Sequence, residues 1–261
     1  MNNLFSLEGK NAVVVGGAGG IGQAIAQGFA AAGANVAIAS RRKESLERAV
    51  NEIEANVQGA KVRYYAVDVC SEEEVRSLVD SAVADMGKID ILVCSQGLNK
   101  KIPLSEMPSD VFDQMLNVNV TGVMICCKYF AEHMKKNNYG KIIVISSVRG
   151  KIASRNIGNV GYCTSKAAVD MLTKQVASEL GQYNITVNAI GPTVTETPMM
   201  KENIEQHGGD EYRKKLAANL LIKRMATPED TVGPAIFLAS EASDFVTGNV
   251  IYPDGGLTSV G

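Results

Sequence analysis

Near the start of the sequence, three valines at 13–15 lead directly into a cluster of glycines that runs from Gly16 to Gly22. The apolar run predicts a buried parallel strand, and the alanine-rich residues after the glycines predict a helix. Gly16 lets the chain turn sharply, Gly20 lets the backbone approach a pyrophosphate, and Gly22 lets the helix pack against the strand. A second strand at 35–40 completes a βαβ unit. This arrangement favours dinucleotide binding at the open helix N-terminus over a plain turn.

Composition limits the alternatives. The chain has 261 residues and a net charge of −2, so bulk electrostatics suggests neither a nucleic-acid partner nor an acidic membrane. It has no apolar run of the ~20 residues that span a bilayer, and its first ten residues lack a secretory pattern. Its five cysteines show no CxxC spacing and are expected to be buried, reduced thiols. With only two histidines, we expect no metal site, and we expect a cytoplasmic protein.

Strand-like and helix-like segments alternate along the rest of the chain. Ser71 with Glu74 predicts a capping box, and the Thr-Pro pair at 227–228 predicts a further helix start. Strands are expected at 61–67, 89–94, 140–146, 185–190 and 249–252, and helices at 43–58, 71–87, 110–136 and 160–183. Seven strands separated by helices predict an α/β fold: a single domain over 1–261 with a doubly wound, mostly parallel sheet.

Two segments interrupt this alternation. Residues 98–107 follow the fourth strand, and residues 193–224 separate the sixth strand from the last helix. Both leave the sheet at the carboxyl ends of strands, where open α/β sheets bind ligands. We interpret them as substrate loops, the second as a mobile lid, with plain surface excursions as the alternative.

The chemistry is predicted to lie at Tyr162 and Lys166, which stand four residues apart on one face of a helix. They follow a strand that ends at Ser146 and Ser147, at the sheet edge where the cofactor is expected. A tyrosine with an ordinary pKa of about 10 is a poor base at neutral pH. A neighbouring ammonium would lower that pKa toward the range of a general acid–base, and the Ser147 hydroxyl would hold the substrate oxygen.

An ordered set of motifs from residue 7 to 256 resembles the classical short-chain dehydrogenases/reductases. It consists of the glycine cluster, Asp68-Val69, Asn119 in NVNVTG, Ser147, Tyr162 with Lys166, Asn188-Ala189-Ile190-Gly191-Pro192 and Asp254-Gly255-Gly256. The resemblance implies a Rossmann-type fold and an NAD(P)-dependent oxidoreductase acting on CH–OH groups. It implies that Tyr162 donates or accepts the proton and that Ser147 orients the substrate. Lys166 would bind the nicotinamide ribose and lower the Tyr162 pKa, and Asn119 would hold a water relay.

The same resemblance implies the cofactor contacts. They are Gly16, Gly19, Gly20, Ile21 and Gly22 at the pyrophosphate, Asp68 and Val69 at the adenine, Gly97 where the backbone passes the cofactor, and Pro192, Val194 and Thr197 at the carboxamide. The sequence departs from the family pattern in four places. Val15 replaces a threonine, Cys94-Ser95-Gln96-Gly97 replaces Asn-Asn-Ala-Gly, Pro192-Thr193 replaces Pro-Gly, and the spacing from Ser147 to Tyr162 is longer, which leaves Ser146 as an alternative to Ser147.

The end of the second strand predicts which coenzyme binds. An NAD site places a carboxylate about 20 residues past the glycines, where it accepts from the ribose 2′-hydroxyl. Here Ser40 takes that place, and Arg41 and Arg42 follow it. A guanidinium forks onto a 2′-phosphate with charge-assisted hydrogen bonds, so the sequence favours NADP(H) over NAD(H). A solvated basic helix start is the alternative.

Basic residues in the loops near the expected site point to a polar substrate. They are Lys100, Lys101, Arg149, Lys151 and Arg155. The segments at 99–101 and 243–248 resemble sugar-acid members of the family such as gluconate 5-dehydrogenases. We therefore expect a polyhydroxylated small-molecule substrate, with a 3-oxoacyl-(acyl-carrier-protein) reductase as the alternative and a non-catalytic cofactor sensor as a third reading. The resemblance also implies a homotetramer formed through the helices at 110–136 and 160–183 and through the C-terminal strand.

Overall fold

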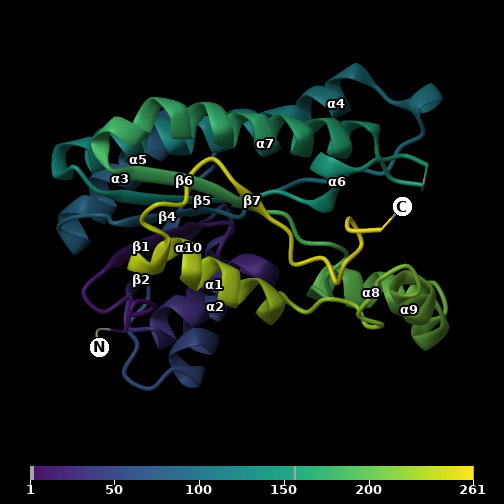
Figure 1. Cartoon of the computed structure of the whole chain (residues 1–261), viewed down its shortest axis with the longest axis horizontal. Coiled ribbons are helices and arrows are strands. Elements are labelled where there is room, and N and C mark those ends of the chain that lie inside the picture. Colours follow the sequence, from purple (N-terminus) through teal and green to yellow (C-terminus); the bar gives the residue numbers. More distant parts are fainter. Residues whose placement is uncertain (1–2, 156, 261) are drawn as a thin grey trace.

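The computed structural model describes residues 3–155 and 157–260, and in this part of the chain seven strands form one sheet (Figure 1). Neighbouring strands are parallel in the order β3-β2-β1-β4-β5-β6-β7, which confirms the predicted doubly wound sheet. The strands are β1 (Asn11–Val15), β2 (Asn35–Ser40), β3 (Arg63–Ala66), β4 (Ile91–Cys94), β5 (Gly140–Ile145), β6 (Ile185–Ile190) and β7 (Val250–Ile251). The strand order reverses between β1 and β4, and such a switch point places a ligand crevice at the carboxyl ends of the strands.

Helices cover both faces of the sheet (Figure 1). One face carries α1 (Gly20–Ala31), α2 (Lys43–Asn56) and α10 (Val232–Ala239), and the other carries α3 (Glu72–Met86), α5 (Gly122–Asn137) and α7 (Val160–Leu180). Alternate residues of each strand point to opposite faces. Val14 therefore packs in the core with α1, whereas Val13 and Val15 pack in the core with α3 and α5. A strand buried on both sides needs a continuous apolar run, which is what the sequence has at 12–15.

The helix expected at 110–136 is interrupted. It consists of α4 (Ser109–Leu116), a π-helical turn (Asn117–Thr121) and α5. A π turn inserts one extra residue into a helix and is frequent at functional sites. The predicted helix at 160–183 ends at Leu180 and closes with a 3₁₀ turn (Gly181–Tyr183). The remaining predicted strands and helices are present with ends shifted by a few residues.

Only half of the capping box predicted at α3 forms. The Ser71 hydroxyl accepts a hydrogen bond from the Glu74 N–H at 3.3 Å, as expected. The Glu74 carboxylate, however, accepts from the backbone N–H of Asp68 at 2.8 Å instead of that of Ser71. The chain turn that follows β3 offers this second donor, so Glu74 ties α3 to the segment at Asp68. At 227–230, by contrast, the predicted helix start forms a complete capping box between Thr227 and Asp230.

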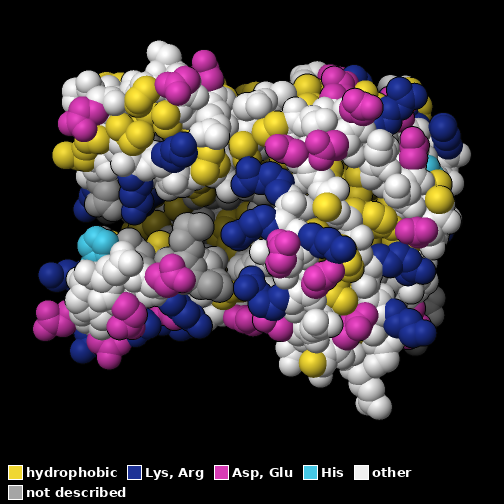
Figure 2. Space-filling model, turned by 180° about the vertical axis from the view of Figure 1, so that it is seen from behind, with side chains coloured by type: hydrophobic (Ala, Val, Ile, Leu, Met, Phe, Trp, Pro, Cys, Tyr) yellow, Lys and Arg dark blue, Asp and Glu magenta, His cyan; other side chains and the backbone are white. Residues whose placement is uncertain are grey.

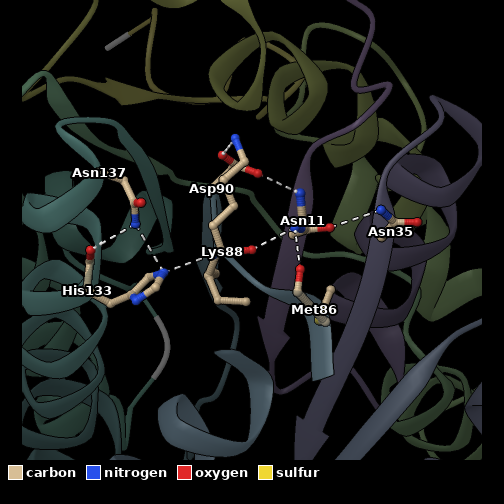
Figure 3. A network of polar contacts seen from close by, with 8 residues as sticks. Asn11, Asn35, Met86, Lys88, Asp90, His133 and Asn137 are labelled. Carbon is tan, nitrogen blue, oxygen red and sulfur yellow. Dashed lines mark hydrogen bonds and ion pairs between the residues drawn. The ribbon is translucent and has the colours of Figure 1, made fainter. Parts of the chain in front are cut away.

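A network of polar contacts closes the amino-terminal edge of the sheet, opposite the predicted site (Figure 3). The Asn11 amide donates to the carbonyls of Met86 at 3.0 Å and Lys88 at 2.7 Å, and its backbone N–H donates to buried Asp90 at 2.9 Å. Beside it, Nε2 of His133 accepts the N–H of residue 89 at 3.2 Å. These contacts join β1, α3, β4 and α5 by backbone groups, so this edge is structural.

The carboxyl-terminal edge carries the two predicted insertions. The segment at 193–224 contains α8 (Pro198–Gln206) and α9 (Gly209–Ala217), which stand away from the sheet (Figure 1). Figure 2 shows a hollow between this segment and the part of the surface formed by α4, with lysine and arginine side chains at its border. Of the described residues, no helix combines the length and apolar character needed to cross a membrane.

Candidate active site

The glycine cluster has the tight geometry that the sequence predicts. Gly16 adopts φ 80°, in the left-handed region that favours glycine. A Cβ atom on Gly16 would lie 2.5 Å from the backbone N of Gln96, and one on Gly22 would lie 2.3 Å from the Gly16 carbonyl oxygen. Gly17, which we did not single out, is equally constrained, because its Cβ would lie 2.8 Å from Ile38 Cγ2. The loop therefore tolerates no side chain at these three positions.

The N-terminus of α1 is shaped to receive an anion. Its N-cap residue, Gly19, makes no side-chain cap, so the first N–H groups of α1 are left for a ligand. A Cβ atom on Gly19 would meet nothing within 4 Å, and one on Gly20 would lie 3.1 Å from Thr197 Cγ2. Ile21 packs against the core behind the loop. The structure thus brings Thr197, from the far insertion, next to the glycine loop.

The end of β2 lies beside the segment at Asp68. The N–H of residue 67 donates to the Ser40 carbonyl at 3.0 Å. Burial raises the pKa of the Cys70 thiol, and the charge of exposed Arg41 acts to lower it, so Arg41 lies close to this segment. Arg42 is also exposed and precedes α2. Val69 packs on Gly122, whose Cβ would lie 2.9 Å from Val69 Cγ2. The predicted adenosine residues Ser40, Arg41, Arg42, Asp68 and Val69 therefore come together at the carboxyl ends of β2 and β3.

Tyr162 and Lys166 lie farther along the carboxyl-terminal edge of the sheet, on the first turns of α7. The Lys166 Nζ stands 5.7 Å from the centroid of the Tyr162 ring and donates to the Ile145 carbonyl at 2.7 Å. A Cβ on Gly97 would lie 3.8 Å from the same Nζ, so the loop after β4 passes directly beside it. Lys166 is buried and Tyr162 is half-buried. The predicted pair therefore sits at the carboxyl ends of β4 and β5.

The two candidate serines have different partners. The Ser147 hydroxyl caps α6 (Val148–Lys151) by accepting from the Arg149 N–H at 3.1 Å, and it acts to lower the pKa of the Tyr162 phenol. The Ser146 hydroxyl donates to the Asp170 carboxylate. Ser147, and not Ser146, is therefore the serine that influences the phenol.

The pKa of Tyr162 differs from our expectation. Burial raises it above its ordinary value, and the hydrogen bond from Ser147 and the charge of Arg149 oppose this rise only in part. Burial also lowers the pKa of Lys166 to about 8, against the opposing charge of Asp170. We expected the Lys166 ammonium to lower the phenol's pKa, but the groups that lower it here are Ser147 and Arg149, and removal from water is the larger effect. With the protein groups alone, Tyr162 stays protonated at neutral pH.

Asn119 lies in the π turn and holds two elements together. Its Oδ1 accepts from the Leu98 N–H at 2.7 Å, and its Nδ2 donates to the Leu98 carbonyl at 2.9 Å and to the Ser165 hydroxyl at 2.9 Å. The side chain is fully buried. Asn119 thus fixes the loop after β4 against α7, beside Lys166. The Ser165 hydroxyl, which the sequence analysis did not single out, in turn donates a hydrogen bond to the Tyr162 carbonyl at 2.8 Å.

The segment after β6 lies against the site. The Pro192 carbonyl accepts from the Val148 N–H at 3.1 Å and from the Ser147 hydroxyl at 3.5 Å. Val194 is half-buried, and Thr197 caps α8 by accepting from the N–H of residue 200 at 3.3 Å. The three predicted carboxamide residues therefore form one stretch between Ser147 and the glycine loop.

Four of the five predicted basic residues border the site from two loops. Lys100 donates to Gln114 at 2.8 Å, and Lys101 is exposed beside it. Arg149 and Lys151 lie on α6, directly after Ser147, and Arg149 donates to the carbonyl of residue 153 at 2.8 Å. The two loops are joined by a backbone hydrogen bond of 3.2 Å between residues 102 and 158. Arg155 lies farther along the second loop and is exposed.

Asp170 and Tyr252 complete the site and were not singled out from the sequence. The Asp170 carboxylate accepts from Ser146 and, at 3.3 Å, from the Tyr252 hydroxyl. The Tyr252 ring covers Gly191, where a Cβ would lie 2.5 Å from Tyr252 Cε1. These contacts join β5, α7 and β7 behind the catalytic candidates. No local sequence pattern predicts this pair, because Tyr252 and Asp170 are 82 residues apart in the sequence.

The glycine loop, the open helix N-terminus and the Tyr162–Lys166 pair fit a nicotinamide-dependent oxidoreductase, and comparison with known proteins identifies the family. Residues 16–258 match the family model described as enoyl-(acyl carrier protein) reductase. The chain belongs to the short-chain dehydrogenase/reductase family and is an NAD(P)-dependent oxidoreductase acting on CH–OH groups.

The relatives include enzymes of sugar acids. The chain is 34% identical over 257 residues to the 5-keto-D-gluconate 5-reductase of Escherichia coli (strain K12), covering 98% of both chains. It is 35% identical to the gluconate 5-dehydrogenase of Gluconobacter oxydans, covering 98% of this chain and 97% of that one. A crystal structure of a gluconate 5-dehydrogenase from Burkholderia cenocepacia, in complex with NADP and tartrate, superposes with a TM-score of 0.90 at 33% identity and 99% coverage of both chains.

Proposed function

We propose that the protein interconverts a secondary alcohol and a ketone on a polar sugar acid or polyol, with NADP(H) as coenzyme. The observation that carries the proposal is that Tyr162 lies close to both Ser147 and Lys166, with Gly97 beside Lys166, at the sheet edge that also holds the glycine loop. A dinucleotide lying along this edge would reach from Arg41 to Lys166. The residues fit such a group, since the loop has the close backbone packing and the uncapped helix that a pyrophosphate needs.

In the proposed mechanism, a bound nicotinamide would supply a hydride to the substrate carbon in reduction and would accept one from it in oxidation. Tyr162 donates a proton to the ketone oxygen in reduction and removes it from the alcohol in oxidation. Tyr162 is protonated at neutral pH, as an ordinary phenol is, and burial raises its pKa further, so it is ready to donate a proton in the reductive direction. Ser147 donates a hydrogen bond to the same oxygen and stabilises the charge that develops on it.

The other two candidates act beside the proton donor. Lys166 binds the ribose hydroxyls of the coenzyme, and its ammonium favours the phenolate after proton transfer. Asn119 keeps Leu98 and α7 in register, so that Gly97 leaves room beside Lys166. Its proposed part in a water relay falls to its backbone, because its side chain is already engaged by Leu98 and Ser165.

The preference for NADP(H) over NAD(H) is supported by the end of β2. Ser40 has no carboxylate to repel a 2′-phosphate, and Arg41 and Arg42 are exposed beside it. The related Burkholderia cenocepacia structure is described as a complex with NADP. Asp68 and Val69 would then bound the adenine, and Pro192, Val194 and Thr197 the carboxamide.

The sugar-acid assignment is supported by charge and by the relatives. Arg149 and Lys151 follow Ser147 on α6, and Lys100 and Lys101 lie in the loop after β4, so ammonium and guanidinium groups that suit a carboxylate or hydroxyl-rich substrate come from both segments. The segment at 193–224, with α8 and α9, is proposed as the lid over this substrate. The alternative, a 3-oxoacyl-(acyl-carrier-protein) reductase, is supported by 36% identity over 251 residues to that enzyme from Thermotoga maritima.

A homotetramer in the cytoplasm is part of the proposal. Met124 on α5 and Met171 on α7 are exposed, with 40% and 62% of their surface accessible. Large apolar side chains on the outer faces of these two helices suit contacts with other copies of the chain. Sedimentation equilibrium should therefore give about four times the monomer mass.

The experiment that separates the two substrates is a panel followed by absorbance of the reduced nicotinamide. The panel pairs gluconate and 5-keto-D-gluconate with acetoacetyl thioesters, each with NADP(H) and with NAD(H). Turnover of the sugar acids is the expected result. Turnover of the thioesters without any of the sugar acids would replace the proposal by its alternative.

A further inference from the structure

Gln96, in the loop after β4, has a buried side-chain amide that the site described above does not use. Neither its Oε1 nor its Nε2 has a hydrogen-bond partner among the described residues, and both atoms are shielded from solvent. Folded proteins rarely leave buried donors and acceptors unpaired, because each loses its hydrogen bonds to water without replacement. An amide with both groups unpaired therefore calls for a ligand that the protein does not itself provide.

The position of Gln96 indicates which ligand this is. Its backbone N lies 2.5 Å from the place where a Cβ of Gly16 would stand. The next residue, Gly97, would place a Cβ 3.8 Å from Lys166 Nζ. Gln96 thus lies between the glycine turn and the lysine. A dinucleotide that reaches from one to the other must carry its sugar–phosphate chain past this residue.

We propose that the Gln96 side-chain amide binds the sugar–phosphate chain of the nicotinamide coenzyme, a proposal that rests on coenzyme binding along this edge. An amide suits that chemistry, since its NH₂ donates to phosphate or ribose oxygens and its carbonyl accepts from ribose hydroxyls. In the present rotamer neither polar atom has free surface, so the contact requires rotation of the side chain. The rotation pairs two groups that are otherwise unpaired, and this gain favours the bound position.

The test uses Gln96→Ala and Gln96→Leu in the full chain, with Gln182→Ala, an exposed glutamine in the turn after α7, as the matched control. Two quantities are measured: the melting temperature of the free protein, and the Kd for NADPH from its fluorescence. Because the unpaired amide contributes no hydrogen bond to the free protein, Gln96→Leu should melt at or above the wild-type temperature, whereas Gln96→Ala should melt lower by the packing that its side-chain carbons lose. Their Kd for NADPH should rise about tenfold or more, the loss expected for hydrogen bonds to a charged or hydroxyl-rich ligand.

The opposite pattern would overturn the proposal. If both variants melt lower than wild type and keep its Kd within about twofold, the amide serves the protein and not the coenzyme. Failure of the proposed function looks different, because wild type and Gln182→Ala would then show no NADPH binding either. Leucine preserves the side-chain volume, so it separates a lost hydrogen bond from a cavity at this position.

Discussion

Replacing Asn119 by alanine should destabilise the protein and slow turnover together. The substitution removes the partner of the Leu98 N–H, now at 2.7 Å, and of the Leu98 carbonyl, now at 2.9 Å. Ser165 still donates to the Tyr162 carbonyl, so it keeps a partner. An unpaired buried group costs about 1–3 kcal/mol, which gives about 2–6 kcal/mol for the two groups of Leu98. Water that enters the new space pairs them in part, so we expect a loss of about 2–3 kcal/mol.

The assay combines urea unfolding with steady-state kinetics. Asn119→Ala should lower the free energy of unfolding by that amount. It should also reduce kcat, because Gly97 next to Leu98 lies beside Lys166. The matched control is Asn249→Ala, an exposed asparagine whose amide donates only to the carbonyl of residue 247, and it should change stability by less than about 0.5 kcal/mol. An Asn119→Ala protein as stable as this control would refute the role of Asn119 in fixing the loop after β4 against α7.

Three further outcomes are expected. Arg41→Ala should raise the KM for NADPH about tenfold by loss of a charge-assisted contact and leave the KM for NADH unchanged. The control, Arg48→Ala, should change neither KM. Equal effects of Arg41→Ala on both coenzymes would refute the 2′-phosphate assignment. Gly22→Ala should lower the free energy of unfolding in urea by about 1–3 kcal/mol, because its Cβ would lie 2.3 Å from the Gly16 carbonyl oxygen. The control, Gly181→Ala, should be neutral in the same assay, because its Cβ would meet nothing within 4 Å. Burial lowers the pKa of His133 below its ordinary value of 6.5, so on acidification the unfolded chain is protonated at this histidine before the folded one. The free energy of unfolding should therefore fall as the pH drops below about 6.5. His133→Gln should flatten that part of the pH profile.

Local patterns predicted the fold correctly, and they predicted that Tyr162 and Lys166 lie close together. The valine run before Gly16 and the glycine spacing describe a strand, a turn and a helix without reference to the rest of the chain. The four-residue spacing of Tyr162 and Lys166 likewise needs only one helix. Seven alternating strands and helices then leave few arrangements besides a doubly wound parallel sheet.

What the sequence did not predict depends on long-range contacts. The roles of Asp170 and Tyr252 arise from a hydrogen bond across 82 positions. The direction of the Tyr162 pKa depends on how much of the phenol is removed from water, which only packing determines. The π turn at Asn117–Thr121 has no compositional mark, because it differs from an α-helix by a single inserted residue. Glu74 accepts from the backbone N–H of Asp68, six residues away, which a local capping-box pattern does not predict.

The most direct measurement compares turnover and coenzyme binding in Tyr162→Phe. Loss of the phenolic hydroxyl should reduce kcat at least ~10²-fold, as expected when a general acid–base group is removed. The Kd for NADPH and the melting temperature should remain near wild type, and Tyr183→Phe, in the turn after α7, should retain full activity. A Tyr162→Phe enzyme that reduces its ketone substrate at close to the wild-type rate, with coenzyme bound, would contradict the assignment of Tyr162 as the proton donor.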